Sequence, residues 1–465
     1  MTARRWVALP VLLAAVFVTT LDFFVANLAV PSIRADLRAD DAGVQLVIAG
    51  YGLAYAAGLI VAGRLGDLYG HRRVFALGLA LFTLASAGCG LAYDIGVLVA
   101  ARVAQGAAAA LLAPQVLTLL GALYQGADRA RAFGWYGAAV GLAGVSGQVA
   151  GGLLVAADPL GLGWRACFLV NVPAGVAALA LIGRLLPRTG RSGTRRDLDL
   201  VGAALVAAGL AVVVLTLVEG REQGWPPWTW WCLAASGPIL GAFVRRQRRL
   251  AADGRVPLLD LAVFGEKGFA GGLVAVALLF GTSAGLSFVL ALYAQEGLGL
   301  GPLAAGVMCT ALNAGFLVAS LRPRPMGAPA LLLGLVLLYC GVAWGWGPYG
   351  VAAALLVTGA GMGWLMSPLI SSVLSAVRAE RAGAAAGVLG TVQETGGVLG
   401  GTLTGAAFFG ALDGGWDAAA QAGIVVLIVG AGGVLAHSAL RLRRDAAASA
   451  VARFHVKQEC PADRP

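Results

Sequence analysis

The sequence predicts an all-α membrane protein with about fourteen transmembrane helices. Of its 465 residues, 59% are hydrophobic and only 12% are charged, whereas an ordinary soluble domain has about 25% charged residues. The mean hydropathy is +0.84. Many apolar runs reach the roughly 20 residues that a helix needs to cross a bilayer, and the alternating pattern of a membrane β-barrel is absent. These observations argue against a soluble fold.

The apolar runs also place the individual helices. The first run contains Asp22 and has no clear small-residue cleavage site, so we expect it to be a retained helix and not a signal peptide. The last twenty or so residues have the composition of a disordered tail. The expected helices lie at about 6–30, 43–63, 74–92, 96–123, 131–156, 165–186, 198–218, 228–244, 268–293, 303–321, 328–346, 349–375, 383–411 and 419–440.

Basic residues predict the orientation of these helices. About 28 of the 33 Lys and Arg residues fall in loops on one side of the alternation. Arg34, Arg38, Arg165 and Arg221 fall on the other side, and Arg102 lies within a helix. The positive-inside rule then puts both termini in the cytoplasm, with the chain in the cell membrane. The net charge of +10 is therefore interpreted as a topology signal beside anionic lipid, and no nucleic-acid partner is expected.

The sequence gives no sign of a cofactor, a metal site or an enzyme. The six cysteines are scattered without CxxC or Cys/His spacing, and the three histidines are far apart. HExxH and GxSxG motifs and an ATP-binding P-loop are all missing. Any uphill transport would therefore draw on an ion gradient.

An internal repeat divides the chain into two related halves. A shift of 250 residues overlays Gly137, Gly147 and Gly151 on Gly387, Gly397 and Gly401. The same shift overlays Arg131 on Arg381. Such repeats are typical of transporters whose halves rock around a central site. Two helices near 198–244 would then be an insert between the halves.

One loop carries a family resemblance. The segment Gly63-Arg-Leu-Gly-Asp-Leu-Tyr-Gly-His-Arg-Arg73 joins the second and third helices and resembles the signature loop of the major facilitator superfamily. Its glycines allow a tight turn and close helix approach, while Asp67 can either pair with Arg72 or Arg73 or cap the N-terminus of a neighbouring helix. The resemblance implies a conformational latch made by Gly63, Arg64, Gly66, Asp67, Gly70, Arg72 and Arg73.

Three further segments narrow the resemblance to the fourteen-helix drug:proton antiporter branch. They are Leu21-Asp-Phe-Phe-Val-Ala-Asn-Leu-Ala-Val-Pro31, Arg102-Val-Ala-Gln-Gly106 with Pro114, and Trp164-Arg-Ala-Cys-Phe-Leu-Val-Asn-Val-Pro173. Phe24 departs from the Thr that is common in that branch. The implied major facilitator fold has a six-helix bundle at 1–186, a linker with two inserted helices at 187–262, a second six-helix bundle at 263–440 and a cytoplasmic tail at 441–465.

A row of glycines marks the fifth helix. Gly137, Gly141, Gly144, Gly147 and Gly151 follow one another at spacings of 4, 3, 3 and 4 residues, which puts them along one helical face. The row resembles the antiporter motif of this branch, although the usual Gly-Pro dipeptide is Gly147-Gln148 here. A small-residue packing seam explains the glycines equally well.

Three ionisable residues fall at membrane depth, where they are costly and usually functional. Asp22 lies about 12 Å and Arg102 about 9 Å from the same membrane surface, at about 1.5 Å per helical residue. The two can therefore pair, either as a proton-coupling site or as a static ion pair. Glu394 lies near the midplane, where the branch often has Gln. It is a candidate second proton site, an attractor of cationic substrates or a protonated donor between helices.

The resemblance implies a function and a cavity. It implies a proton-coupled exporter of drugs, antibiotics or amphipathic secondary metabolites, with small amphipathic or cationic molecules, protons and the lipid bilayer as partners. A carrier of one narrow metabolite, working in either direction on the same fold, is the alternative. The candidate cavity residues are Asn27, Gln105, Gln148, Asn313 and Gln393.

Overall fold

A computed structural model describes residues 6–39, 41–157, 161–186, 199–255, 257–266, 268–300, 302–322, 324, 326–378 and 381–459. These residues contain fourteen helices of 15 or more residues and no strand, which confirms the predicted all-α fold. Nine of the described helices are long and apolar enough to cross a membrane, and α12 and α13 are shorter apolar helices.

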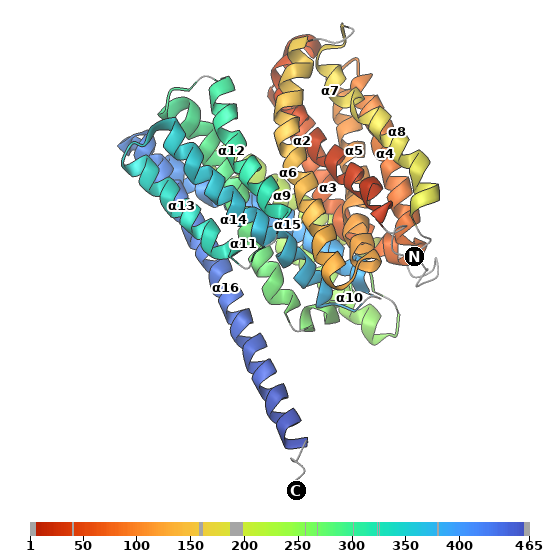
Figure 1. The fold of residues 1–465 in the computed structure, drawn as a ribbon. Helices are drawn as coiled ribbons and strands as arrows, with labels where there is room; N and C mark the ends of the chain where they lie inside the picture. The colour runs from red at the N-terminus through yellow and green to blue at the C-terminus, as the bar shows by residue number, and fades with distance from the viewer. Residues whose placement is uncertain are drawn as a thin grey trace.

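The first half of the chain forms one bundle, coloured red to yellow in Figure 1. Within it α3 packs along α5, α5 along α4, and α2 along α6. Asp94 caps the N-terminus of α5 by accepting a hydrogen bond from the Val97 N–H at 2.8 Å. The helices are α2 (Leu9–Leu37), α3 (Asp41–Tyr69), α4 (His71–Gly90), α5 (Ile95–Leu123), α6 (Gly126–Ala157), α7 (Ala166–Leu169) and α8 (Asn171–Leu185).

The second half forms another bundle, coloured green to blue in Figure 1. Its main contacts pair α12 with α14 and α11 with α15, and α13 packs on both α14 and α16. The helices are α11 (Phe269–Leu292), α12 (Pro302–Ser320), α13 (Gly327–Ala343), α14 (Gly347–Ser375), α15 (Ala382–Gly410) and α16 (Trp416–Glu459).

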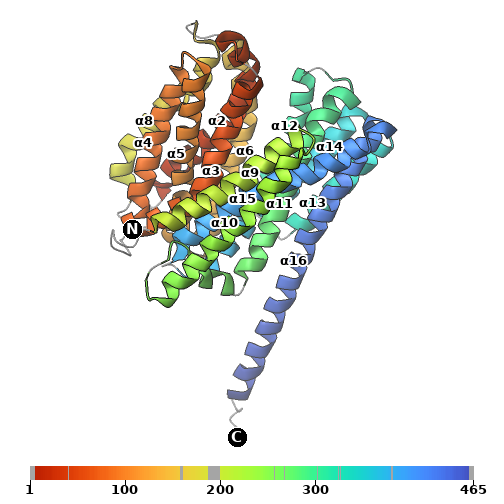
Figure 2. The same cartoon turned by 180° about the vertical axis from the view of Figure 1, so that it is seen from behind.

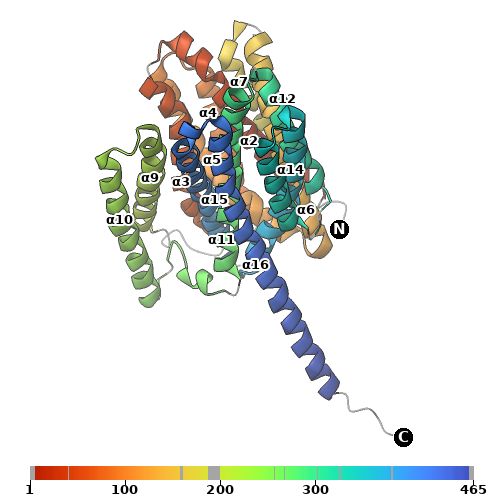
Figure 3. The same cartoon turned by 90° about the vertical axis from the view of Figure 1, so that its left-hand side faces the viewer.

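The insert between the halves is a helical hairpin of α9 (Leu200–Glu222) and α10 (Pro227–Ala252). Figures 2 and 3 show it lying outside the two bundles, with α9 on the inner side. Asp199 fixes its base by accepting hydrogen bonds from Gly202 N–H, Arg246 Nε and Gln247 Nε2 at 2.8–2.9 Å. Because α9 packs on both α3 and α15, the hairpin contacts both halves.

The end of the chain differs from the sequence prediction. We expected a helix at 419–440 followed by a disordered tail, but α16 continues without a break to Glu459, and Figure 3 shows it projecting beyond the bundle. For residues 441–459 the prediction of disorder was wrong, because this segment is rich in Ala and Arg, which favour helix, and has no Gly or Pro. Residues 460–465 lie outside the described part of the chain.

The two halves touch most closely at the end of the molecule that carries both termini, which we call the terminus end. There α3 and α15 run antiparallel, with Gly63 against Gly383 and Leu59 against Gly387. On the other side of the interface α6 contacts α12 and α14. Figures 1 and 2 show the ribbons of the two halves diverging toward the opposite end. The halves are thus closed together at the terminus end.

Candidate functional site

A buried polar network surrounds Asp22 on α2. Arg102 Nη1 donates to Asp22 Oδ2 at 2.7 Å. The other carboxylate oxygen, Oδ1, accepts hydrogen bonds from Gln105 Nε2 at 2.9 Å and Asn171 Nδ2 at 2.7 Å. Ser86 Oγ lies between these two amides and accepts from both, at 2.7 and 3.0 Å. Residues from four helices, α2, α4, α5 and α8, therefore form one network around the carboxylate.

Arg102 is held from several directions. Its Nε donates to the backbone carbonyl of Val47 at 3.1 Å, and its Nη1 also donates to Gln105 Oε1 at 2.7 Å. The guanidinium carbon lies 4.3 Å from the centre of the Tyr51 ring and 5.6 Å from that of Phe168, distances at which a cation is attracted to the ring face. Its position is fixed by polar and aromatic contacts together.

The network is closed to its surroundings. Asp22 has no exposed surface, and Arg102 is 1% exposed. A buried ion pair of this kind is strongly destabilised when one partner loses its charge, because the other is left uncompensated. The pair is therefore costly to break while it stays buried.

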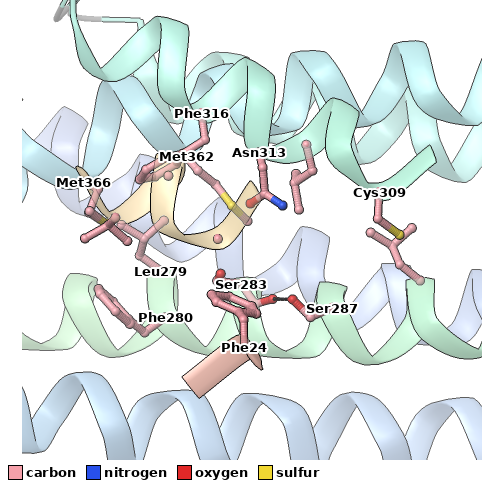
Figure 4. Close-up of a pocket in the computed structure, with 15 residues that line it drawn as sticks. Phe24, Leu279, Phe280, Ser283, Ser287, Cys309, Asn313, Phe316, Met362 and Met366 are labelled. Carbon is pink, nitrogen blue, oxygen red and sulfur yellow. Dashed lines mark hydrogen bonds between the residues drawn. The ribbon is translucent and has the colours of Figure 1, made fainter. Parts of the chain in front are cut away.

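A separate cavity of about 280 Å³ lies between the two halves. Figure 4 shows Asn313 from α12 and Met362 from α14 projecting toward Ser283 on α11, with Phe24 from α2 beside them. Ser287 donates to the Ser283 carbonyl at 3.0 Å, so its hydroxyl is already engaged. The full lining is Phe24, Val140, Gly141, Gly144, Leu279, Phe280, Ser283, Ser287, Leu290, Cys309, Leu312, Asn313, Phe316, Met362 and Met366.

The structure separates the predicted cavity residues. Asn313 lines the cavity. Gln105 does not, because both ends of its amide are engaged in the Asp22 network. Gln393 lies on α15 and is not part of the lining. The side chains of Asn27 and Gln148 lie outside the described residues.

Loop 63–73 lies at the terminus end, where it bridges the halves. Asp67 accepts hydrogen bonds from the backbone N–H groups of Gly383 and Ala384, at the N-terminus of α15, where a helix favours negative charge. His71 Nε2 lies 3.5 Å from Asp67, and His71 Nδ1 lies 2.8 Å from Gln115 Oε1. Of the two partners considered from sequence, Asp67 thus takes the helix N-terminus.

The rest of the loop is shaped by close approach. Gly63 has no room for a Cβ because the Gly383 carbonyl occupies that place, and Gly66 lies equally close to the Gln115 side chain. Gly70 adopts a φ of 91° between α3 and α4, a region that only glycine enters easily. Arg72 donates to the Gly183 carbonyl at 3.0 Å, while Arg73 is exposed.

The glycine row of α6 also lies where helices meet. Gly137 faces Ser320 and Ser367, and Gly141 faces Phe316, all in the other half. Gly144 and Gly147 face Phe24 on α2. The row is thus a close-packing surface that continues into the cavity wall through Gly141 and Gly144. Gly151 is buried further along α6.

The two halves, the cavity between them and the loop that bridges them agree with one family. The family model described as Major Facilitator Superfamily matches residues 12–401. The chain belongs to the major facilitator superfamily. It is thus a multi-pass membrane protein of a transporter family.

Relatives of this major facilitator protein have been named for the compounds they handle. The chain is 39% identical over 377 residues to the probable actinorhodin transporter of Streptomyces coelicolor, covering 78% of this chain and 65% of that protein. It is 37% identical over 342 residues to the puromycin resistance protein of Streptomyces alboniger, covering 71% of this chain and 66% of that protein. The chain thus spans just under two thirds of the length of these relatives.

A solved structure shows the same fold at low sequence identity. The human organic anion transporter MFSD10 superposes with a TM-score of 0.63 at 17% identity, covering 94% of this chain and 99% of that one. At this identity the likeness concerns the fold alone.

Sequence reasoning missed three members of the Asp22 network in this major facilitator protein. Asn171 lies within the segment 164–173 that carries the resemblance, and its position there is the signal that could have found it. Ser86 is a small polar residue in an apolar run, which packing alone explains equally well. Tyr51 gave no signal, because its contact with Arg102 depends on how α3 lies against α5.

Glu394, the third predicted charge, lies apart from this network on α15. It forms no ion pair with a basic residue in the described part of the chain. Three tyrosines lie close enough for its charge to act on their hydroxyls, namely Tyr51 and Tyr55 of α3 and Tyr136 of α6. The structure therefore gives Asp22 and Glu394 different surroundings.

Proposed function

We propose that this chain is a proton-coupled exporter of small amphipathic molecules, such as antibiotics and related secondary metabolites, of the fourteen-helix drug:proton antiporter branch. It would lie in the cell membrane with both termini in the cytoplasm and work by alternating access of the two halves. The observation that carries the proposal is an apolar cavity between the halves that shares helix α2 with the buried Asp22–Arg102 pair. Phe24 of α2 lines the cavity, and Asp22 of α2 forms the ion pair.

The cavity wall supports the proposed substrate class. Its described lining is mainly aliphatic and aromatic and contains no charged side chain. Ligand sites are typically apolar with a few polar groups that orient the ligand, and here Asn313 and Ser283 supply such groups. Met362 and Met366 add flexible surface that adapts to ligands of different shape. Such a wall suits molecules with a large apolar body and few polar atoms.

The Asp22 network supports proton coupling. A proton that reaches Asp22 would neutralise the carboxylate and weaken its hold on Arg102. Asp22 lies on α2, which also carries Phe24 in the cavity wall. Any shift of α2 when the ion pair breaks would therefore move Phe24 and change the shape of the cavity. The names of the relatives, an actinorhodin transporter and a puromycin resistance protein, support export of antibiotics.

The loop at the terminus end supports alternating access. It closes the two halves through the hydrogen bonds that Asp67 accepts from Gly383 and Ala384. Arg129 adds a second bridge by donating to Ser371 Oγ at 3.1 Å and to the Ser371 carbonyl at 3.3 Å. Opening of this end would require both contacts to break. We assign the role of a conformational latch to loop 63–73 on this ground.

The test is efflux of a fluorescent lipophilic dye from loaded cells, with and without a collapsed proton gradient. Wild type should show gradient-dependent efflux, and Asp22→Asn should abolish it while the protein still inserts in the membrane. The matched control is Asp36→Asn, because Asp36 pairs with Arg165 at the same 2.7 Å but is half exposed. Full gradient-dependent efflux by Asp22→Asn would contradict the proposal. A folded wild type that moves no dye would favour a narrow-substrate carrier instead.

A further inference from the structure

The antiparallel contact of α3 with α15 brings Glu394 to a group of tyrosines. Gly63 meets Gly383, and Leu59 meets Gly387 and Gly390. One further turn along each helix, in opposite directions, leads to Tyr55 on α3 and Glu394 on α15. Close backbone contact at the glycines leaves little freedom in this register. This register brings Tyr55 and Glu394 to a similar level on facing helices of the two halves, where the charge of Glu394 acts on the Tyr55 hydroxyl.

Glu394 has no cationic partner in the described part of the chain. Glu394 acts electrostatically on the hydroxyls of Tyr51, Tyr55 and Tyr136, and no described basic residue forms an ion pair with it. Asp22, by contrast, is matched by Arg102 at 2.7 Å. An acid at membrane depth without a cationic partner points to a function. A positive group that enters from outside would supply the missing charge.

The rings give the site a shape. Tyr51 and Tyr55 stack with their centres 6.1 Å apart and their planes 9° from parallel. Tyr136 approaches from α6, one turn before Val140, which lines the cavity. Tyrosine faces attract organic cations, and a nearby carboxylate adds direct charge attraction. The group thus combines the two features by which proteins recognise ammonium and other onium centres.

We propose that Glu394, Tyr55 and Tyr136 form a subsite for the positively charged centre of a lipophilic organic cation, while the apolar cavity takes the body of the molecule. The inference rests on the proposed function, because it assumes that the cavity holds the transported compound. It assigns Glu394 to substrate recognition and leaves proton coupling to Asp22.

The position of Arg102 selects the side on which the cation binds. The Arg102 guanidinium already lies over Tyr51, one of the two stacked rings, with its carbon 4.3 Å from the ring centre. A second positive charge there would be repelled. The cation is therefore expected next to Tyr55, with Tyr51 between it and Arg102. This arrangement also places the two positive charges on one aromatic stack, so that each influences how firmly the other is held.

The test is equilibrium binding of tetraphenylphosphonium to the purified full-length protein in detergent, compared with its neutral relative triphenylphosphine oxide. Glu394→Gln should weaken tetraphenylphosphonium binding by about tenfold or more, equivalent to about 1.4 kcal/mol, and leave triphenylphosphine oxide unchanged. The matched control is Glu296→Gln, which removes an exposed acid from the same half and should change neither affinity.

Two outcomes would overturn the inference. One is tetraphenylphosphonium affinity that stays within twofold of wild type in Glu394→Gln. The other is an equal loss for both probes, which would indicate a damaged cavity. If Glu394→Gln does not yield folded protein, Tyr55→Leu replaces it. That variant should weaken binding of the cation alone, and unchanged binding would equally refute the subsite.

The same measurements distinguish a failure of the cation subsite from a failure of the proposed proton-coupled export. Binding in detergent needs no proton gradient. A protein that binds tetraphenylphosphonium through Glu394 but shows no gradient-driven efflux would contradict proton coupling and retain the subsite. Efflux that depends on Asp22 but is indifferent to Glu394→Gln, for cationic and neutral dyes alike, would contradict the subsite and retain the transporter.

Discussion

Asp22 and Phe24 lie two residues apart on α2 and face opposite directions, Asp22 into the polar network and Phe24 into the cavity. Two residues correspond to about 200° around a helix, so one short segment serves both places. The backbone of α2 packs on α6 at the same level, where Gly144 and Gly147 lie against Phe24. A change in the ion pair can therefore reach the cavity through a single rigid helix.

The buried ion pair should respond to substitution far more than an exposed pair of equal length. Arg102→Ala should destabilise the protein by about 3–5 kcal/mol, because it leaves the Asp22 carboxylate buried without its cation. Arg165→Ala, which breaks the half-exposed pair with Asp36, should cost no more than about 1 kcal/mol. Thermal unfolding of the detergent-solubilised variants measures both. Combining Arg102→Ala with Asp22→Asn should recover part of the loss, and a double variant less stable than the single one would refute this account.

Asn171→Leu tests the donor that sequence reasoning missed. It removes two hydrogen bonds, to Asp22 Oδ1 and to Ser86 Oγ, and leaves buried acceptors short of a donor. We expect a loss of about 1–3 kcal/mol in stability and reduced but still gradient-dependent efflux, because the Arg102 contact remains. Thermal unfolding is measured on the detergent-solubilised variant, and dye efflux on loaded cells that produce it. A variant as stable as wild type would show that Asn171 does not hold the carboxylate.

Gly63→Ala should interfere with closure at the terminus end. The added methyl group would overlap the Gly383 carbonyl, so α3 and α15 could not approach as closely. We expect slower efflux and faster labelling of a reporter cysteine placed at the α15 N-terminus. Gly52→Ala on the same helix is the control, because the space around its Cβ is open. That change should stabilise the helix by about 1 kcal/mol and leave efflux intact, and equal effects of the two changes would argue against the contact.

Met362→Trp should narrow the cavity between the halves. The larger ring would occupy space that Met362 now leaves to a ligand near Ser283 and Asn313. Bulky dyes should then show at least a fivefold higher KM for efflux, while small substrates are affected less. Met326→Trp is the matched control, because Met326 is exposed and lies outside the lining. An unchanged KM for the bulkiest dye would place the substrate elsewhere.

The contribution of the α9–α10 hairpin base to thermal stability should decrease at acid pH. Burial raises the pKa of Asp199, but hydrogen bonds from Gly202, Arg246 and Gln247 outweigh this and hold the pKa below its usual 3.8. A lowered pKa means that the stabilisation is complete above the ordinary value and is lost as pH falls through the folded value. Wild type should therefore lose thermal stability below about pH 4. Asp199→Asn should start less stable at pH 7 and lose less on acidification. Identical pH profiles would refute the role of Asp199.

Helices and the strongest charge pair were predictable from the sequence, for a simple physical reason. A bilayer requires long apolar helices, and their directions fix the depth of each charge. Asp22 and Arg102 were expected at similar depth, and the structure places them 2.7 Å apart. Their roles in proton coupling remain a prediction.

Side-chain partners were harder to predict because they depend on helix rotation and on the register between helices. Gln105 was assigned to the cavity, yet its rotation on α5 points it at Asp22. The partner of Asp67 comes from α15, more than 300 residues later in the chain. The level of Glu394 relative to Tyr55 is set by the glycine contacts of α3 with α15. The hydropathy of the sequence predicts the depth of a residue along the membrane normal, but it does not predict which side of the helix the residue faces.

The contact between Gly63 and Gly383 bears on how fast the protein can cycle. Two glycine backbones meet there without side chains, so parting them exposes little apolar surface to water. Other contacts at that end include hydrogen bonds, from the Gly383 and Ala384 N–H groups to Asp67 and from Arg129 to Ser371, and water can replace each of these bonds on opening. The free-energy barrier to separating the two halves is thereby kept low, although the glycine contact still fixes how they fit together. A seam of this kind favours short dwell times in the closed form, where a seam of interlocked leucines would hold the halves together.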